Sequence, residues 1–218
     1  MNRLREGKVE ENDKELLLSR VTQEAHLDTE AMHIFYTNDE VSGHNNRMLE
    51  QLEGEMVTLK AKKEGGPKGY VAPITNDGRI GSTQFFDKLN IKIGARVALT
   101  FNVSTMDGLV NGACGVIVGI ESTSKLAKEK RVHAIIVKFD DEKCGREHRQ
   151  KNPRFSKKYE KENGTPIFRT DLEYNIPSKK GFSGSAVAKV EQFPLRISYA
   201  STAHRMQVSQ YSLELSTF

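Results

Sequence analysis

The sequence has too few cysteines for a disulfide-stabilised fold and no hydrophobic run long enough to cross a membrane. Cys114 and Cys144 are its two cysteines and lack a C-x-x-C spacing, which excludes a disulfide scaffold. No stretch of 18 apolar residues occurs among the 218, which excludes a transmembrane helix. The N-terminal residues lack the apolar segment of a secretory signal. We therefore expect free thiols and an intracellular protein without a membrane partner, with the choice between nucleus and mitochondria left open.

Hydrophobic residues make up 37% of the chain and charged residues 28%, a balance that predicts a folded core. The net charge of +4 is unevenly distributed. Residues 125–162 contain 13 basic and seven acidic residues, so the rest of the chain is slightly acidic. A basic segment on such a body is compatible with a polyanionic partner. A solvated, lysine-rich loop explains the same charge, and composition does not separate the two.

The first third of the chain has the pattern of an α/β unit. Residues 12–21 predict a helix that Asn12 caps, with an apolar face of leucines and a valine. Residues 31–36 predict a short buried strand. Thr37, followed three residues later by Glu40, is a capping box that starts a second helix. That helix places Val41, Met48 and Leu52 on one side and ends at Gly54.

The middle of the chain has the pattern of short strands joined by glycine turns. Residues 64–83 contain five Gly and two Pro and predict a loop or linker, and the basic stretch 141–163 predicts a second long loop. Asp107-Gly108 and Asn111-Gly112 are turn signals. Such a pattern is typical of a small antiparallel barrel. The predicted strands cover residues 95–102, 115–120, 132–139, 168–174, 186–190 and 195–200.

Four blocks together resemble the Pif family of DNA helicases, in order and in spacing. The block NRLREGKVEENDKELLLSRV (2–21) is similar to the stretch that precedes the family's fourth helicase motif. The block FYTNDEVSGHNNRML (35–49), a strand followed by Thr-Asn and a helix bearing Asn45, resembles that motif itself. LNIKIGARVALTFNVSTMDGLVNGACGVIVGI (89–120) is similar to the family's inserted SH3-like barrel. QFPLRISYASTAHRMQ (192–207) resembles the later strand and turn written A-x-T-x-H-K-x-Q-G.

The resemblance implies an α/β fold, a partial RecA-like P-loop-NTPase domain interrupted by a small antiparallel SH3-like β-barrel. Residues 1–85 are expected to form the first part of the second RecA-like domain. Residues 86–190 are expected to form the barrel with its basic loop 141–163, and residues 191–218 the return to the RecA-like domain. The family's members move 5′ to 3′ on single-stranded DNA and unwind duplexes with ATP and magnesium. Roles in DNA repair, recombination and telomere maintenance are implied with them.

The resemblance also implies which residues touch DNA. Thr37 and Asn38 are expected at a strand end that faces DNA, and Thr202 and His204 on a later DNA-facing turn, because hydroxyl and imidazole groups are phosphate donors that read no base. Lys92 and Arg96 are candidates for further backbone contacts by their charge. Gln207, with Arg205 beside it, is expected near nucleotide-linked groups. No catalytic residue and no metal ligand is expected in this chain.

The sequence lacks the parts that bind and cleave ATP. No G-x-x-x-x-G-K-[ST] phosphate cradle occurs. Asp39-Glu40 imitates a metal-holding motif, but the capping box with Thr37 explains Glu40 without a metal. The family's last arginine motif is also absent, so the ATP and magnesium site is expected to be incomplete. We expect the chain to work with an N-terminal helicase half encoded elsewhere and not to hydrolyse ATP alone.

The final turn departs from the family pattern. Val208 stands where the family has Gly, Arg205 where it has Lys, and Gln210 where Thr is usual. A valine does not readily adopt a positive φ angle, so the geometry of this DNA-facing turn is in question. Two alternatives therefore stay open at this point. Instead of a part of a helicase motor, the chain would be a nucleic-acid-binding β-barrel module without motor function or a transposon-derived remnant.

Overall fold

The structure is a computed structural model of the chain that describes residues 7–19, 21, 31–66, 68, 70–122, 131–176 and 186–203. It divides into two compact units, residues 1–32 and residues 33–218. None of the described helices is long and apolar enough to cross a membrane. Both cysteines are free and buried.

The described part of the first unit contains helix α2 (Glu11–Leu18). Its N-cap is Glu10 and not Asn12, which lies inside the helix. The backbone N–H of Glu10 donates to the Asp13 carboxylate at 3.1 Å, so the reciprocal contact of a capping box forms two residues earlier than the sequence predicted. The leucines of the predicted apolar face, Leu16, Leu17 and Leu18, are all exposed.

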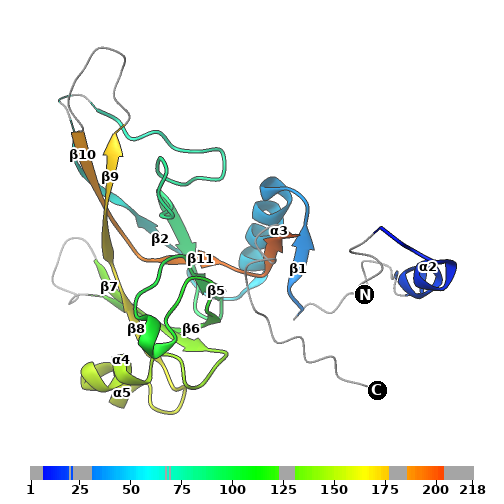
Figure 1. The fold of residues 1–218 in the computed structure, drawn as a ribbon. Helices are drawn as coiled ribbons and strands as arrows, with labels where there is room; N and C mark the ends of the chain where they lie inside the picture. The colour runs from blue at the N-terminus through cyan, green and yellow to red at the C-terminus, as the bar shows by residue number, and fades with distance from the viewer. Residues whose placement is uncertain are drawn as a thin grey trace. The chain divides into compact units, whose positions relative to one another are not determined.

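The second unit begins with a strand and a helix, as predicted. Strand β1 (His33–Phe35) leads into helix α3 (Asn38–Gln51), and Thr37 is the N-cap that the sequence indicated. β1 pairs in parallel with β12 (Ala200–Thr202), in the register His33 to Ala200 and Phe35 to Thr202. Segments far apart in the chain thus form one small parallel sheet beside α3 (Figure 1).

Helix α3 buries Val41, Asn45 and Leu49, whereas the sequence predicted Val41, Met48 and Leu52. The helix ends at Gln51, and Leu52 is its C-cap. Aromatic contacts attach the helix to β1: the His44 ring lies 4.3 Å from the His33 ring, centroid to centroid. The buried residues of α3 are spaced four positions apart, as expected for one face of a helix, and include an asparagine.

Asn45 connects α3 to the last strands of the chain. Its side-chain oxygen accepts hydrogen bonds from the backbone N–H groups of Tyr199 and Ala200, both at 2.9 Å. Its amide nitrogen donates to the Ile197 carbonyl at 3.3 Å. These backbone groups lie where β11 (Leu195–Ile197) ends and β12 begins. One side chain thus satisfies the backbone hydrogen-bonding groups between the two strands. The sequence predicted a single strand there.

The main sheet has five antiparallel strands in the order β11-β5-β6-β7-β8. Its ends, β11 and β8, do not pair with each other, so the described strands form no closed barrel, and the barrel predicted from the sequence is not confirmed. The mixed α/β class is confirmed. The remaining bounds are β5 (Arg96–Leu99), β6 (Cys114–Ser122), β7 (Val132–Phe139) and β8 (Thr165–Phe168).

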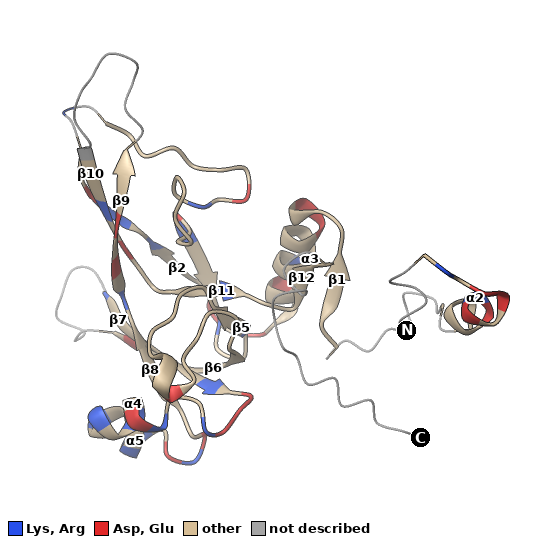
Figure 2. Cartoon of the chain, viewed as in Figure 1, with Lys and Arg blue, Asp and Glu red and all other residues tan. Residues whose placement is uncertain are grey.

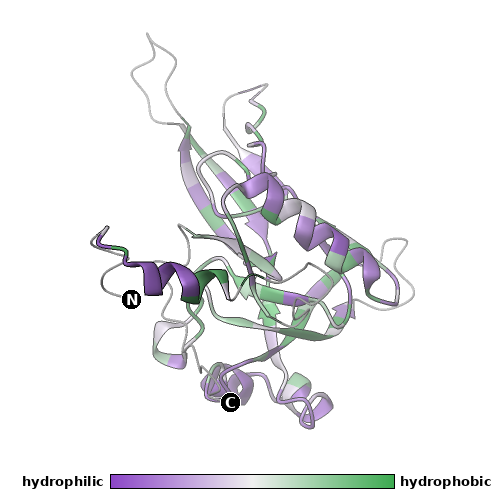
Figure 3. Ribbon diagram, turned by 90° about the vertical axis from the view of Figure 1, so that its right-hand side faces the viewer, coloured by the Kyte–Doolittle hydropathy of each residue, from purple (hydrophilic) through white to green (hydrophobic). Residues whose placement is uncertain are grey.

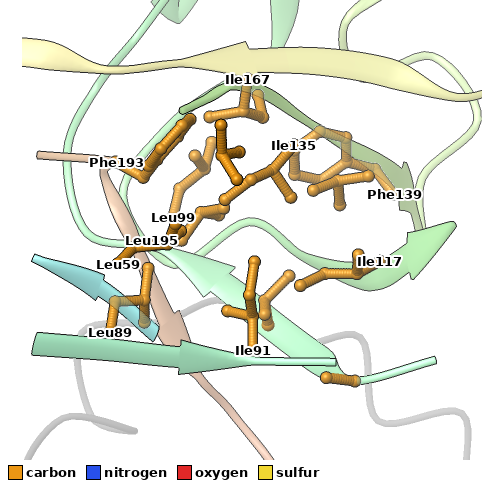
Figure 4. Close-up of a cluster of buried hydrophobic side chains, with 14 of the residues drawn as sticks. Leu59, Leu89, Ile91, Leu99, Ile117, Ile135, Phe139, Ile167, Phe193 and Leu195 are labelled. Atoms are coloured by element: carbon orange, nitrogen blue, oxygen red, sulfur yellow. The ribbon is translucent and has the colours of Figure 1, made fainter. Parts of the chain in front are cut away.

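Two smaller antiparallel sheets complete the unit. One pairs β2 (Val57–Lys60) with β4 (Lys88–Ile91). The other has the order β3-β10-β9, with β3 (Lys62–Gly65), β9 (Thr170–Ile176) and β10 (Ala186–Gln192). Apolar side chains from β2, β4 and the main sheet meet in one core, which includes Ile117, Ile135 and Phe193 (Figure 4). The strands of the main sheet are largely apolar, whereas the helical segments are largely hydrophilic (Figure 3).

The sequence predicted a long loop for the basic stretch after β7. The structure instead forms two short helices there, α4 (Arg146–Lys151) and α5 (Pro153–Lys158). The buried Asp107 carboxylate accepts hydrogen bonds from the first-turn N–H groups of Glu147 at 2.9 Å and His148 at 2.8 Å. A short 3-10 turn, Thr105–Asp107, carries this carboxylate. A cap from a residue 40 positions away stabilises helices too short to stand alone.

Replacing Asn45 by Ala removes the acceptor of two backbone N–H groups at the β11–β12 break. Because these groups are partly or fully buried and would be left without this acceptor, we expect the unfolding free energy to fall by about 2–3 kcal/mol. The matched control is Asn46→Ala on the exposed face of the same helix, for which a change within about 0.5 kcal/mol is expected. Urea denaturation of the full chain measures both. Equal losses in the two variants would contradict the connecting role of Asn45.

The folded chain should also lose stability in mild acid. Burial lowers the pKa of His148, while the Pro166 carbonyl and Asp107 raise it in part and Lys151 lowers it further. The folded state thus favours neutral His148, so its contribution is complete above the unfolded pKa of 6.5 and is lost as pH falls through the lower folded pKa. His148→Phe keeps a ring against Phe168 without titrating. Urea unfolding at about pH 7.5 and about pH 5 should show a smaller loss in this variant than in the original chain, and equal losses would exclude His148 as a source.

Candidate nucleic-acid interface

The candidate interface lies where the parallel strands β1 and β12 end. Phe35 and Thr202 are paired at these two ends, and Thr37 lies two residues beyond Phe35. Ligands of open α/β sheets bind at the carboxyl ends of parallel strands, where loops and helix N-termini face outward. The fold thus brings two predicted site residues, Thr37 and Thr202, to one sheet edge although 165 positions separate their numbers in the chain.

The capping box at the start of α3 is closed. The Glu40 carboxylate accepts a hydrogen bond from the Thr37 hydroxyl at 2.7 Å and from the Thr37 backbone N–H at 2.9 Å. The Thr37 hydroxyl in turn accepts one from the Glu40 N–H at 3.3 Å. The hydrogen bonds from Thr37 hold the pKa of Glu40 below its usual range. Glu40 is thus explained without a metal.

Two carboxylates determine the electrostatics of this helix end. Asp39 and Glu40 both lie in the first turn of α3, where they stabilise the helix dipole. A DNA phosphate at the same helix end would have to displace Glu40 and approach Asp39. This helix end is therefore unfavourable for a phosphate or another anion.

Tyr36 is the surface feature of this end that sequence reasoning missed. It lies between β1 and Thr37, and 92% of it is exposed. The sequence predicted it to be part of a buried strand, because residues 31–36 are apolar and aromatic. An exposed ring at a sheet edge is a platform on which a base of any type can stack. Ile34 is exposed between partly buried His33 and Phe35. The sequence does not show this alternation of burial, because Ile34 and Phe35 are both apolar.

A groove of about 570 Å³ begins at the same helix end. Asn38 and Ser42 of α3 form one side of it, and the segment of residues 74–90 forms the other, with Arg196 also in the lining. Asparagine side chains are frequent there: Asn38, Asn45, Asn46, Asn76 and Asn90. Amide groups both donate and accept hydrogen bonds, as the edges of nucleic-acid bases do.

The other predicted strand-end residues differ in accessibility. Thr202 is the last residue of β12 and is 8% exposed, so its hydroxyl offers less surface than Thr37 does. His204, Arg205 and Gln207 lie outside the described residues, as do Val208 and Gln210 of the questioned turn.

Lys92 has a different position from the one expected of a DNA contact. It is 7% exposed, and its ammonium group donates to the carbonyls of Leu52 at 2.7 Å and Glu50 at 3.3 Å. These carbonyls belong to the C-terminal end of α3, where a cation stabilises the helix dipole. Lys92 therefore caps the C-terminal end of α3, and its ammonium group is directed to these carbonyls and not to the surface.

Arg96 is half-buried and faces a carboxylate. Its two guanidinium nitrogens contact the two oxygens of Asp140, at 3.2 and 2.5 Å, which is the geometry of a bidentate pair. A phosphate would have to compete with Asp140 for this guanidinium group.

The described residues also contain no group of three or more His, Cys, Asp or Glu side chains that could hold a metal ion.

Two curated relatives match the chain in sequence, and no protein-family model matches it. The ATP-dependent DNA helicase Pif1 of Campylobacter jejuni is 30% identical over 171 residues, which cover 78% of this chain and 32% of that protein. Human ATP-dependent DNA helicase PIF1 is 36% identical over 87 residues, 40% of this chain and 12% of the relative. The chain thus spans less than a third of the length of these helicases.

Solved helicase structures share the fold. Unliganded Pif1 from Bacteroides superposes with a TM-score of 0.60 at 19% identity, over 94% of this chain and 38% of that one. Bacteroides Pif1 bound to single-stranded DNA gives 0.58 at 19% identity over the same shares. Pif1 from Candida albicans gives 0.55 at 17% identity, over 94% and 43%. In sequence and in fold, this chain belongs to the Pif helicase family and matches a part of its longer members.

Proposed function

We propose that this chain forms single-stranded DNA contacts within a Pif-type, ATP-dependent helicase that moves 5′ to 3′. The observation that carries the proposal is the exposed Tyr36 beside Thr37 and Asn38 at the ends of two adjacent parallel strands. The family membership supports it, since one similar structure is described as Pif1 bound to single-stranded DNA.

The chemistry of the strand end favours stacking and hydrogen bonding over charge. The Tyr36 ring supplies a π-face, on which stacking contributes about 1–3 kcal/mol per base. The Asn38 amide, exposed at the first helical position, can donate to and accept from a base or the sugar. Thr37 positions both by fixing the start of α3 through Glu40. Such contacts tolerate any sequence, as a translocating motor requires.

The described residues do not fit an ATP site. The helix N-terminus that could receive a triphosphate, that of α3, already holds the Glu40 carboxylate, and the sequence contains no phosphate cradle. ATP and magnesium therefore belong to a helicase assembly in which an N-terminal half supplies the cradle. The role of this chain there is to hold DNA.

We also propose that the sheets of residues 86–190 take the place of the family's inserted barrel. The open main sheet keeps the expected strands β5, β6 and β7 in antiparallel order. Residues 1–85 and 191–218 are then the flanking parts of the RecA-like domain, and the pairing of β1 with β12 joins these two parts.

Replacing Tyr36 by Ala should weaken binding of an oligothymidylate by about five- to a hundredfold, because one stacking platform is lost. Tyr36→Phe is the matched control, since it keeps the ring and removes only the hydroxyl. Its dissociation constant is expected within about twofold of the original. Fluorescence anisotropy with the full chain measures both variants. If Tyr36→Ala bound as tightly as Tyr36→Phe, the strand-end site would be wrong.

The purified chain alone should show no DNA-stimulated ATP hydrolysis. The physical reason is that its sequence contains no phosphate cradle to neutralise and position the triphosphate. Phosphate release in the presence of magnesium and saturating oligothymidylate measures this, with buffer as the baseline. A rate clearly above buffer that follows the chain through purification would contradict the division of tasks between two helicase halves.

A further inference from the structure

Helices α4 and α5 carry the most concentrated positive charge of the described structure. Residues 146–158, here named the basic hairpin, contain six Lys or Arg and one Glu. The charges lie on both helices, beside β8 and away from α3 and β1 (Figure 2). The strand-end site, by contrast, has two carboxylates in its first helical turn. DNA binding by this chain therefore needs a source of phosphate neutralisation that the strand end does not provide.

Three cations of the basic hairpin are exposed and free of acidic partners. Arg149 and Lys158 are engaged: Arg149 donates to the Thr165 hydroxyl at 2.7 Å, and Lys158 pairs with Glu121 at 2.5 Å. Lys151 faces Glu147 at 3.7 Å. Among the described residues, no carboxylate lies within ion-pair distance of the exposed Arg146, Arg154 and Lys157.

The inner face of the basic hairpin is aromatic and fixes it to the sheet. Phe155 of α5 contacts Phe168 of β8 at 5.9 Å and His133 of β7 at 5.8 Å, centroid to centroid. The Tyr159 hydroxyl donates to Glu121 at 2.6 Å. The same hydroxyl lies over Gly119, where an added Cβ would lie 2.4 Å from the Tyr159 oxygen. Only glycine permits this approach.

The base of the hairpin is fixed equally well. Asp107 caps α4, and Arg149 donates to the Cys144 carbonyl at 2.7 Å as well as to Thr165. Burial raises the pKa of the Cys144 thiol to about 12, so the thiol stays neutral and donates to the Gly108 carbonyl at 3.1 Å. The outer cations are thus presented from a fixed platform, which limits the entropy lost when they bind a partner.

We propose that the basic hairpin is a second DNA-binding surface, which holds the phosphate backbone through Arg146, Arg154 and Lys157. This inference rests on the proposed function, which brings DNA to the chain. Guanidinium groups bind phosphate oxygens in a bidentate manner, and lysine adds a point charge. The Phe155 ring of the hairpin packs against Phe168 and His133 of the sheet, so the outer cations hold the backbone without reading bases. Bases are held at the strand end and phosphates at the hairpin.

The test compares two triple variants of the full chain. Arg146→Gln, Arg154→Gln and Lys157→Gln remove three charges from the hairpin. Lys60→Gln, Lys68→Gln and Lys138→Gln remove three charges from exposed positions elsewhere. Fluorescence anisotropy measures the dissociation constants for oligothymidylate and for a duplex over a range of salt concentrations. The two DNAs show whether the hairpin holds the single strand or the duplex ahead of it.

We expect the hairpin variant to bind at least one of the DNAs about tenfold or more weakly at low salt, with a salt dependence reduced by about two to three released ions. The control variant should keep most of the original salt dependence. A hairpin variant indistinguishable from the control would overturn the inference and leave the proposed function standing if Tyr36→Ala still weakens binding. No binding by the original chain would overturn both. A labelled poly-glutamate bound more tightly than either DNA would show that the hairpin binds acidic peptides, and would also overturn the inference.

Discussion

The position of the whole candidate interface depends on the hydrogen bonds of one buried asparagine. Asn45 accepts from two backbone N–H groups and donates to one carbonyl where β11 gives way to β12. β11 belongs to the main sheet and β12 to the parallel pair with β1. Because the chain must leave one sheet and enter the other within two residues, its backbone groups need a partner there. Asn45 supplies it from the helix whose N-terminus borders the site.

Two further contacts make α3 a fixed reference for the strand ends. Glu40 closes its N-terminus with Thr37, and the buried Lys92 closes its C-terminus through the Leu52 carbonyl. Both ends are satisfied by charges of the sign that the helix dipole favours. The consequence for function is electrostatic: the acidic end that stabilises the helix also repels phosphate. An exposed aromatic ring and an amide group lie at this strand end, while the cations without acidic partners lie on the hairpin of α4 and α5.

Local patterns in the sequence predicted the elements that depend on local contacts. The Thr37–Glu40 capping box and strand β7 (Val132–Phe139) are where the sequence placed them. Contacts between distant residues explain the differences. The helices α4 and α5 form on an Asp107 cap that lies 40 residues away, and Lys92 is buried because its acceptors lie at positions 50 and 52. Tyr36 was assigned to a buried strand because composition alone does not show which strand end meets solvent.

The most direct test of the account is a photocrosslink between the full chain and an oligothymidylate that carries 5-iodouracil, with the crosslinked peptides identified by mass spectrometry. This base reacts with aromatic rings on which it stacks, so the position of the crosslink reports the base-binding site. The account predicts crosslinks to the peptide that contains Tyr36, and their loss in the presence of excess unlabelled oligothymidylate. Crosslinks confined to peptides of the hairpin or of α2, with none at Tyr36, would contradict the account.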